Sequence, residues 1–520
     1  MIRRNTQTPA YWEKFQVTRE DIDHLSNLLV EREVPLKLDD LARALVVYCC
    51  REEEQHVAHE LSKGTLYLPG NTYEEGEQIV FPLLEYATAQ VVAIRDGYNP
   101  EHGAFRVIQA QFPGGRLREF AAGLENHPLN DMPPVEQESL RTPADLYQEH
   151  GPRIRAVLGD RLAADPGFIQ LAREWFLKDL LVEISEGQLN LAEAVLDMAG
   201  GGPLPTDRLI GDLDLPEGVD PRLGVFSLNY ALQEDARFDE VGPAGEVLWY
   251  LRRLEPLPVL DPPLHLSPWV VEYDHRVLDE TMLNLERRLD DEWSDLIALP
   301  ETAEPVTIVL AYPHRRSGTL PISSRLTQVF PTGRTHRIRF LFRDGRTGKE
   351  IPGWVVRERR FIYGLEEWYE QNDIPVGAYI DLQQADEPGV VIIRHRPTRP
   401  RREWVRVATV QDERLTFEMT PFSISCEYDE LMVVVADDFL SLSTVSHRVR
   451  RERLSLEKVI GEIFPELAKL SPQGTVHAAT LYSAVNVAIR TPPGPILNVL
   501  RDQYELMGDN YWVMHGRSAA

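Results

Sequence analysis

The sequence is poor in cysteine, with only Cys49, Cys50 and Cys426 among 520 residues. Three cysteines cannot build a disulfide framework, and their spacing fits no zinc site. We therefore expect a reducing compartment, with Cys49 and Cys50 on a helix as small core residues. No run of eighteen apolar residues occurs, so no membrane-spanning helix and no membrane partner are expected. Because the opening MIRRNTQTPAYWEKF also lacks the apolar core of a secretory signal, we predict a cytoplasmic protein.

Catalytic motifs are lacking as well. The chain contains no GxxxxGK[ST] phosphate loop, no GxGxxG between a strand and a helix, no HExxH and no GxSxG. Asp429 and Glu430 could hold a metal only if folding brought further ligands to them. We expect no enzyme, no cofactor and no bound metal, and a metal-dependent nuclease is the enzymatic alternative.

Positive charge is scarce overall but concentrated in one segment. The net charge of −27 argues against a protein that coats nucleic acid along its whole surface, because neutralising phosphates requires Lys and Arg. Residues 311–360, however, contain twelve Lys or Arg against three acids, a net charge of +9. This asymmetry indicates either a nucleic-acid surface or a solvated, arginine-rich sheet face.

A chain of this length exceeds one hydrophobic core and predicts three to five modules. Periodicity and turn residues predict an α+β, multi-domain protein. The expected segments are an N-terminal helical, helix-turn-helix-like segment at 1–65, a small β-barrel at 66–135, a helical segment plus winged helix at 136–258, a linker with a helix at 259–304, a basic pseudobarrel at 305–395, a β extension at 396–440 and a C-terminal winged helix at 441–520.

The N-terminal third combines helices with short strands. Thr18 is placed to cap a helix whose apolar residues follow at helical spacing. GEQIVF and QVVAIRDG are similar to the opening of Src-homology-type and KOW-type barrels, which implies a small binding barrel. The later stretch FIQLAREWFLKDLLVEI is expected to be helical, with a broad apolar face.

Residues 188–253 show the order helix, helix, helix, hairpin. QLNLAEAVLDMAGGG ends in glycines, and Thr206 is placed to cap the next helix. This passage resembles the HARE-type winged helix, the family of the delta subunit of bacterial RNA polymerase. The resemblance is carried by Ala194, Val195, Leu196, Pro203, Leu204, Leu209, Ile210, Phe238, Val241, Gly242 and Trp249.

The third helix of this passage offers only Arg222 as a cation against three acids. In winged helices this helix would enter the major groove, so we expect protein contacts here rather than base readout. The same order recurs over 455–515, after the basic run SHRVRRER that could lie against phosphates.

The segment 305–395 alternates like a closed antiparallel sheet. Its expected strands are VTIVLAY, HRIRFLFRD, GWVVRERRF, GAYIDLQ and GVVIIRHR, with short helices in SGTLPISSRLTQVFP and GLEEWYEQNDIP. This order is similar to the plant-type DNA-binding pseudobarrel of auxin-response and abscisic-acid-response factors, found also in restriction-enzyme effector domains. The resemblance rests on LPISSRLTQVF, the strand with Trp354, the helix with Trp368, and PVGAYIDL, and both tryptophans are expected in the core.

In the pseudobarrel family two basic arms hold the major groove. The resemblance implies that Arg315 and Arg316 stand in the first arm, and that the arginines after Trp354 stand in the second. Alternation in HRIRFLFRD places arginines on one face and apolar residues on the other, and RHRPTRPRREWVR extends the basic tract. The predicted DNA-binding residues are Arg315, Arg316, Arg325, Arg337, Arg339, Arg343, Arg357, Arg359, Arg360, Arg394 and Arg396.

The sequence therefore predicts a DNA-binding accessory or transcription-related regulatory protein. Its expected partners are double-stranded DNA, held by the pseudobarrel, and proteins such as the transcription machinery, recruited by the acidic modules. The alternative is a protein-interaction scaffold whose arginines pair with its own acidic modules, and RNA is a third possible ligand.

Overall fold

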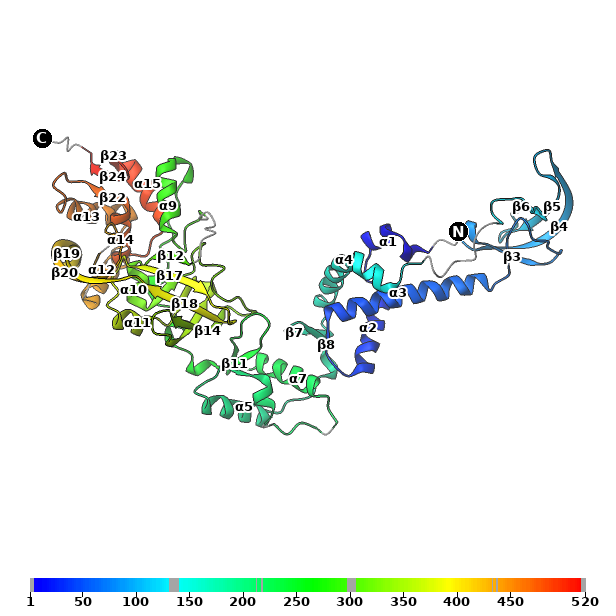
Figure 1. Ribbon diagram of the computed structural model, residues 1–520, viewed down its shortest axis with the longest axis horizontal. Helices are drawn as coiled ribbons and strands as arrows, with labels where there is room; N and C mark the ends of the chain where they lie inside the picture. Colours follow the sequence, from blue (N-terminus) through cyan, green and yellow to red (C-terminus); the bar gives the residue numbers. More distant parts are fainter. Residues whose placement is uncertain are drawn as a thin grey trace. The chain divides into compact units, whose positions relative to one another are not determined.

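The computed structural model describes residues 4–130, 140–211, 213–216, 218–296, 305–432, 434–435 and 438–515. The chain forms two compact units, one of residues 1–184 with 215–230 and one of residues 185–214 with 231–520 (Figure 1). Both units combine helices with sheets, which confirms the α+β class. The finer division into seven segments stays a prediction. No helix within the described residues is long and apolar enough to cross a membrane.

The described residues of the first unit up to residue 184 combine α-helices with a small three-stranded sheet and a five-stranded sheet. The helices are α1 (Pro9–Glu13), α2 (Arg19–Arg32), α3 (Leu38–Leu61) and α4 (Pro143–Ala163). Thr18 caps α2 as predicted, because its hydroxyl accepts from the Asp21 N–H while the Asp21 carboxylate accepts from the Thr18 N–H. Cys49 is buried on α3 and Cys50 is partly buried, as small core residues would be.

A hairpin corrects the helix expected over FIQLAREWFLKDLLVEI. Strands β7 (Phe168–Leu171) and β8 (Glu174–Leu177) leave only two residues for the turn, and the first of these, Ala172, has φ 55°. The strand β1 (Leu36–Lys37) pairs with β8 to give the order β1-β8-β7. A short apolar run fits a buried strand as well as a helix, and pairing with a strand far away in sequence decides between them.

A five-stranded sheet lies between α3 and α4 in sequence. Its strands, in spatial order, are β2 (Thr65–Leu66), β3 (Gln78–Phe81), β4 (Ala87–Asn99), β5 (Gly103–Gln111) and β6 (Leu117–Ala122). The Gly123 N–H donates to the Asn71 carbonyl and the Leu124 N–H to the Pro69 carbonyl. The chain after β6 therefore meets the chain after β2 through these backbone hydrogen bonds.

Within the described residues, the order helix, short strand, helix, helix, hairpin is found three times. In the first unit it is α2, β1, α3, α4 and β7–β8, with the five-stranded sheet between the second and third helices. The second occurrence comprises α5 (Glu186–Met198), β9 (Leu204–Pro205), α6 (Thr206–Ile210), α7 (Pro221–Glu234), β10 (Phe238–Glu240) and β11 (Leu248–Leu251). The third comprises α13 (Leu456–Ala468), β22 (Val476–His477), α14 (Ala478–Ala488), α15 (Pro493–Gln503), β23 (Tyr504–Gly508) and β24 (Tyr511–Met514). In each sheet the short strand pairs with the second strand of the hairpin.

The second occurrence has residues in both compact units. Helix α7 begins in the first unit and ends in the second. Thr206 does not cap α6, because Pro205 occupies the cap position. Instead, Thr206 is buried and its hydroxyl accepts a hydrogen bond from the Trp249 indole. This corrects the capping role expected of Thr206.

The second unit is built around a seven-stranded sheet (Figure 1). Its strands are β12 (Val306–Val309), β13 (Thr319–Pro321), β14 (Arg337–Asp344), β15 (Glu350–Val356), β16 (Phe361–Tyr363), β17 (Tyr379–Gln384) and β18 (Val390–His395), in the spatial order β12-β17-β18-β14-β15-β16-β13. Since β12 and β13 are edges and β14 runs parallel to β18, the sheet is an open, curled half-barrel. The sequence predicted a closed, antiparallel sheet, and the structure corrects both points, because the sheet is open and contains one parallel pair.

The short helices and the buried residues of this sheet lie near the positions that the sequence predicted. The short helices are α10 (Tyr312–Ser317) and α11 (Glu366–Gln371). Helix α10 lies before β13, whereas the sequence predicted a helix within 317–331. In that segment Ser323 and Ser324 lie in a run of turns and donate hydrogen bonds to Asp290. Alternation along β14 is confirmed, since Ile338, Phe340 and Phe342 are buried while Leu341 and the arginines on the other face are only partly buried. Trp354 and Trp368 are in the core.

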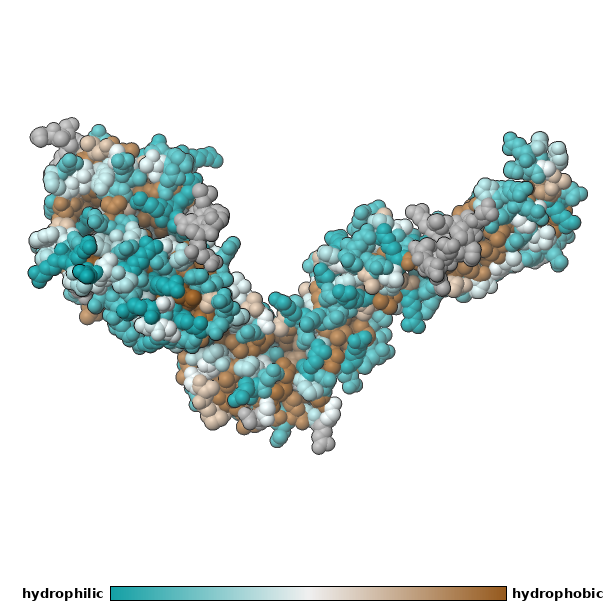
Figure 2. All heavy atoms as spheres, viewed as in Figure 1, coloured by the Kyte–Doolittle hydropathy of each residue, from teal (hydrophilic) through white to brown (hydrophobic). Residues whose placement is uncertain are grey.

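The remaining elements complete the second unit. Strands β19 (Pro397–Gln411) and β20 (Arg414–Cys426) form a long antiparallel ribbon, with β21 (Val434–Val435) beside β19. The helices are α8 (Leu257–Leu260), α9 (Glu280–Leu289) and α12 (Phe439–Glu452). Figure 2 shows hydrophilic residues over most of the visible face of the seven-stranded sheet, whereas hydrophobic residues gather near α5.

Candidate functional site

The first predicted arm lies on α10 and its arginines contact the chain itself. Arg315 Nε donates to the Ile374 carbonyl at 2.5 Å. Arg316 Nη2 donates to Ser443 Oγ at 2.7 Å, so this guanidinium is directed towards α12. Neither side chain extends from the sheet as an arm would.

The second predicted arm is partly engaged as well. Arg357 Nη2 donates to the Pro331 carbonyl at 2.8 Å, and burial lowers the pKa of Arg357. Arg360 Nη1 donates to the Glu292 carbonyl at 2.8 Å, and its guanidinium lies over the Trp293 ring. Arg359 is exposed and has no ion pair or hydrogen bond within the described part of the chain.

The arginines of β14 hold neighbouring segments. Arg337 pairs with Asp239 and, at 3.2 Å from its Nε, with the buried carboxyl of Glu255. Arg339 donates to the Phe340 and Gly353 carbonyls, and burial lowers its pKa. Arg343 pairs with two acids of the same sheet region, Glu350 and Glu387.

The last three predicted residues, Arg325, Arg394 and Arg396, differ in their contacts. Arg325 donates to the Arg287 carbonyl and lies 3.9 Å from Asp290. Arg396 holds Asp381 through two hydrogen bonds of 2.8 and 2.9 Å. Arg394 is exposed, and no ion pair or hydrogen bond joins it to any described residue. The structure therefore engages nine of the eleven predicted arginines and leaves Arg359 and Arg394 open to solvent.

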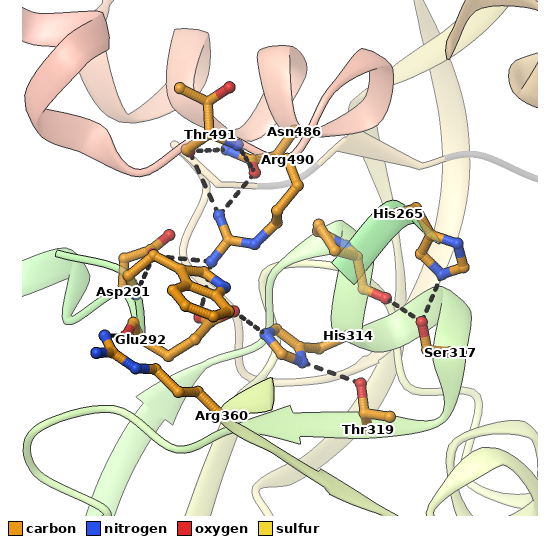
Figure 3. A network of polar contacts seen from close by, with 12 residues as sticks. His265, Asp291, Glu292, His314, Ser317, Thr319, Arg360, Asn486, Arg490 and Thr491 are labelled. Atoms are coloured by element: carbon orange, nitrogen blue, oxygen red, sulfur yellow. Dashed lines mark hydrogen bonds and ion pairs between the residues drawn. The ribbon is translucent and has the colours of Figure 1, made fainter. Parts of the chain in front are cut away.

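A buried charge network, which sequence reasoning missed, joins three segments of the second unit (Figure 3). Arg490 Nη2 lies 2.8 Å from Asp291 and 2.7 Å from Glu292, and His314 Nε2 lies 3.1 Å from Glu292. The hydroxyl of Tyr482 donates to Asp291 at 2.5 Å. All four charged or ionisable side chains of the ion pairs are at most 3% exposed.

Electrostatics explains how this network tolerates burial. Burial alone would raise the pKa of Glu292, but the charges of Arg490 and His314 outweigh it and hold that pKa below its usual range. Removing one member would leave a buried charge without its counter-ion, which is costly. The adjoining cavity of about 30 Å³ has room only for water. The network therefore fastens segments together and offers no space for a substrate.

The signal for this network in the sequence was weak. Asp291 and Glu292 follow α9 directly, while Arg490 follows α14 about 200 residues later. Nothing local to either segment indicates the other. Only the pairing of the three segments in space brings the charges together.

An exposed aromatic residue marks the outer face of the β19–β20 ribbon. Trp404 is 67% exposed, although the neighbouring Val405 on the opposite face is buried in the core. Across the ribbon, Trp404 faces Pro421 and Arg402 faces Ser423, so no acid opposes them there. The side chains of Arg399, Arg401 and Arg402 are exposed and form no salt bridge or hydrogen bond with a described residue, and of the pair Arg401 and Arg402 it is Arg402 that shares the face of Trp404.

Metal-ligating residues do not converge within the described residues. No group of three or more His, Cys, Asp or Glu there could hold a metal ion. Asp429 instead accepts a hydrogen bond from the Leu431 N–H, and the Glu430 carbonyl accepts from Arg406. Comparison with known proteins adds no assignment, since no family model, curated protein or solved structure matches the chain.

Proposed function

We propose that this protein is a non-enzymatic DNA-binding accessory protein with a regulatory role, and that DNA contacts the outer face of the β19–β20 ribbon. The observation that carries the proposal is Trp404, 67% exposed on the same face of β19 as Arg402, with Arg399 and Arg401 exposed nearby on the strand. An exposed indole beside a guanidinium group offers a stacking surface next to a positive charge, which is the combination that single-stranded nucleic acid binds.

Stacking and charge together define the ligand. A base that stacks on an aromatic side chain contributes about 1–3 kcal/mol, and arginines beside the ring attract the phosphates. Only an unpaired base offers its face to Trp404, so single-stranded DNA is the expected form. The engagement of nine predicted arginines within the chain supports placing the contact on the ribbon rather than on the two arms.

We further propose that the three recurring modules are winged helices that contact proteins. Their shared strand pairing supports this identification. Most residues of α15, the third helix of the last module, are buried, and Arg222 on α7 pairs with Glu174. Helices in this state have little free surface for a DNA groove, so the transcription machinery or another protein is the partner that we propose for them.

The test is binding of the full-length chain to a fluorescent single-stranded oligonucleotide at low salt. Trp404→Ala should weaken binding by about 5- to 150-fold, the loss of one stacked base. The matched control is Tyr98→Ala, which removes an aromatic residue that is 76% exposed in the first unit. Duplex DNA and RNA of the same sequence are compared in parallel. Absence of binding by the unaltered protein at low salt would overturn the proposal.

A second candidate function is a protein scaffold without nucleic-acid binding. It is favoured by the pairs that join the seven-stranded sheet to residues 231–258, namely Arg337 with Asp239 and Glu255, and Arg334 with Glu240. In a scaffold the role of the basic segment would be to form these ion pairs. The oligonucleotide titration separates the two functions, because a pure scaffold would bind neither strand form at low salt.

A further inference from the structure

A cavity of about 180 Å³ lies where α12 meets three other segments of the second unit. Helix α12 contributes Ser443, Ser446, His447 and Arg450, whose spacing places them on one helix face. Arg316 at the end of α10 and the short turn around His265 close two further sides. The segment that follows α14, including Arg490, forms the back.

The lining is cationic without a compensating acid. His265, Arg316, His447 and Arg450 all line the cavity, and none of the described residues around it is Asp or Glu. In a chain with 82 acids and a net charge of −27, such a local excess requires an explanation. Burial, reinforced by the positive charges of Arg316 and His314, lowers the pKa of His265 to about 4, so this imidazole is neutral at pH 7 and the arginines carry the positive charge of the lining.

Several donors at the cavity are not satisfied by the chain. Arg450 has a single hydrogen bond, to the Leu264 carbonyl at a long 3.4 Å. His447 is exposed and makes no hydrogen bond or ion pair with a described residue. Most telling is Arg490, which is 1% exposed and whose Nε is buried without an acceptor. Its other nitrogens reach Asn486, Asp291 and Glu292, as Figure 3 shows.

We propose that this cavity binds a phosphate group. Arginine side chains suit this ligand because their planar forks donate two parallel hydrogen bonds to phosphate oxygens. The imidazole of His447 supplies a further donor at the same wall, whereas Ser443 and Ser446 already donate their hydroxyls to backbone carbonyls. The volume lies below the 300–1,000 Å³ of sites that enclose a whole small molecule. A single phosphate, or the phosphate end of a larger ligand, therefore fits best.

Phosphate binding would also stabilise the contact between α10 and the segments around α12. Arg316 comes from α10, between β12 and β13 of the seven-stranded sheet, whereas α12 and Arg490 belong to the C-terminal part of the same unit. A ligand that contacts both sides binds the folded unit and not the unfolded chain, so it raises thermal stability by mass action. The proposal is independent of Trp404 and of DNA binding.

The experiment titrates inorganic phosphate into the full-length chain at constant ionic strength, by calorimetry and by thermal unfolding. The unaltered protein should bind phosphate and melt at a higher temperature in its presence. Arg450→Ala should weaken binding by at least about tenfold, since it removes charge-assisted hydrogen bonds while breaking only one long bond within the chain. His447→Gln provides a second variant in case Arg450→Ala alters folding.

The matched control is Arg501→Ala, which removes an equally exposed arginine outside the cavity. It should leave phosphate affinity unchanged. In addition, phosphate should raise the pKa of His265 in an NMR titration, because an anion would offset the positive charges of Arg316 and His314. Equal weakening by Arg450→Ala and Arg501→Ala would mean non-specific attraction and would overturn the site.

Two sources of phosphate are distinguished by a parallel arm. A short oligonucleotide with a 5′-phosphate is compared with the same strand lacking it, in the Trp404→Ala background. If inorganic phosphate binds and the 5′-phosphate adds nothing, the ligand is a free phosphate. If only the 5′-phosphate improves binding, and Arg450→Ala cancels that gain, the phosphate belongs to nucleic acid. Binding in neither arm overturns the proposal, whereas the ribbon would still bind the strand in the unaltered protein.

Discussion

Glu255 illustrates how a single residue gains an unusual ionisation from its surroundings. Its side chain is fully buried, between Arg337 and Asp239. Burial, together with the neighbouring acid Asp239, raises the pKa of Glu255 to about 8 despite the opposing charge of Arg337. At neutral pH the carboxyl group is therefore largely protonated in the folded protein and ionised in the unfolded chain.

This ionisation predicts a pH-dependent stability. Between the unfolded pKa of 4.5 and the folded pKa of about 8, the native state binds more protons than the unfolded state. The contribution of Glu255 is therefore complete below pH 4.5 and is lost as the pH rises through about 8. In thermal unfolding between pH 5 and 9, Glu255→Gln should flatten the decline seen for the unaltered protein. Glu246→Gln, which changes an exposed acid in the connection between β10 and β11, should leave the decline intact, and an identical decline in both variants would contradict the assignment.

At the scale of elements, alternation was the pattern that predicted best. In β14 the buried set Ile338, Phe340 and Phe342 was readable from the sequence alone, and so were the helices of the last module. The partners of the β14 arginines were not readable, because Asp239 and Glu255 lie about 80 to 100 residues away in sequence. Alternation fixes the face of a side chain but carries no information on what covers that face.

The hairpin β7–β8 shows the opposite case, because the local sequence pattern predicted a helix there. Its turn residue Ala172 has φ 55°, a conformation that disfavours any residue with a Cβ. We expect Ala172→Gly to stabilise the first unit by roughly 1 kcal/mol, measured by urea unfolding of the full-length chain. Ala164→Gly, at the end of α4 where φ is −81°, should destabilise instead. Stabilisation of equal size by both substitutions would show that the turn is not strained.

At the scale of the whole molecule, one arrangement of helices and strands is used three times. Two occurrences were expected from sequence, because their elements follow one another without interruption. The first was not recognised, since the five-stranded sheet separates α3 from α4 by about 80 residues. The exposed Trp404 was also missed as a candidate, because a tryptophan in a strand is more often a core residue.

The charge of the whole molecule predicts weak salt dependence of DNA binding. A chain with net charge −27 repels phosphates except at local basic sites, and the ribbon offers three unpaired arginines. For single strands the slope of log affinity against log salt is about −0.7 per phosphate contact, so we expect a slope of about −2. A titration from low to moderate salt measures it. A slope several times steeper would indicate an extended footprint, such as that of the two barrel arms.

The exposure of Trp404 also gives the molecule a built-in optical reporter. Of its nine tryptophans, this is the single one that solvent reaches over most of its surface. A water-soluble quencher should therefore act first on the emission of this indole, because the others are buried or partly buried. Whatever lies across the ribbon would shield it in turn, so occupancy of this face can be followed by light from the unlabelled protein.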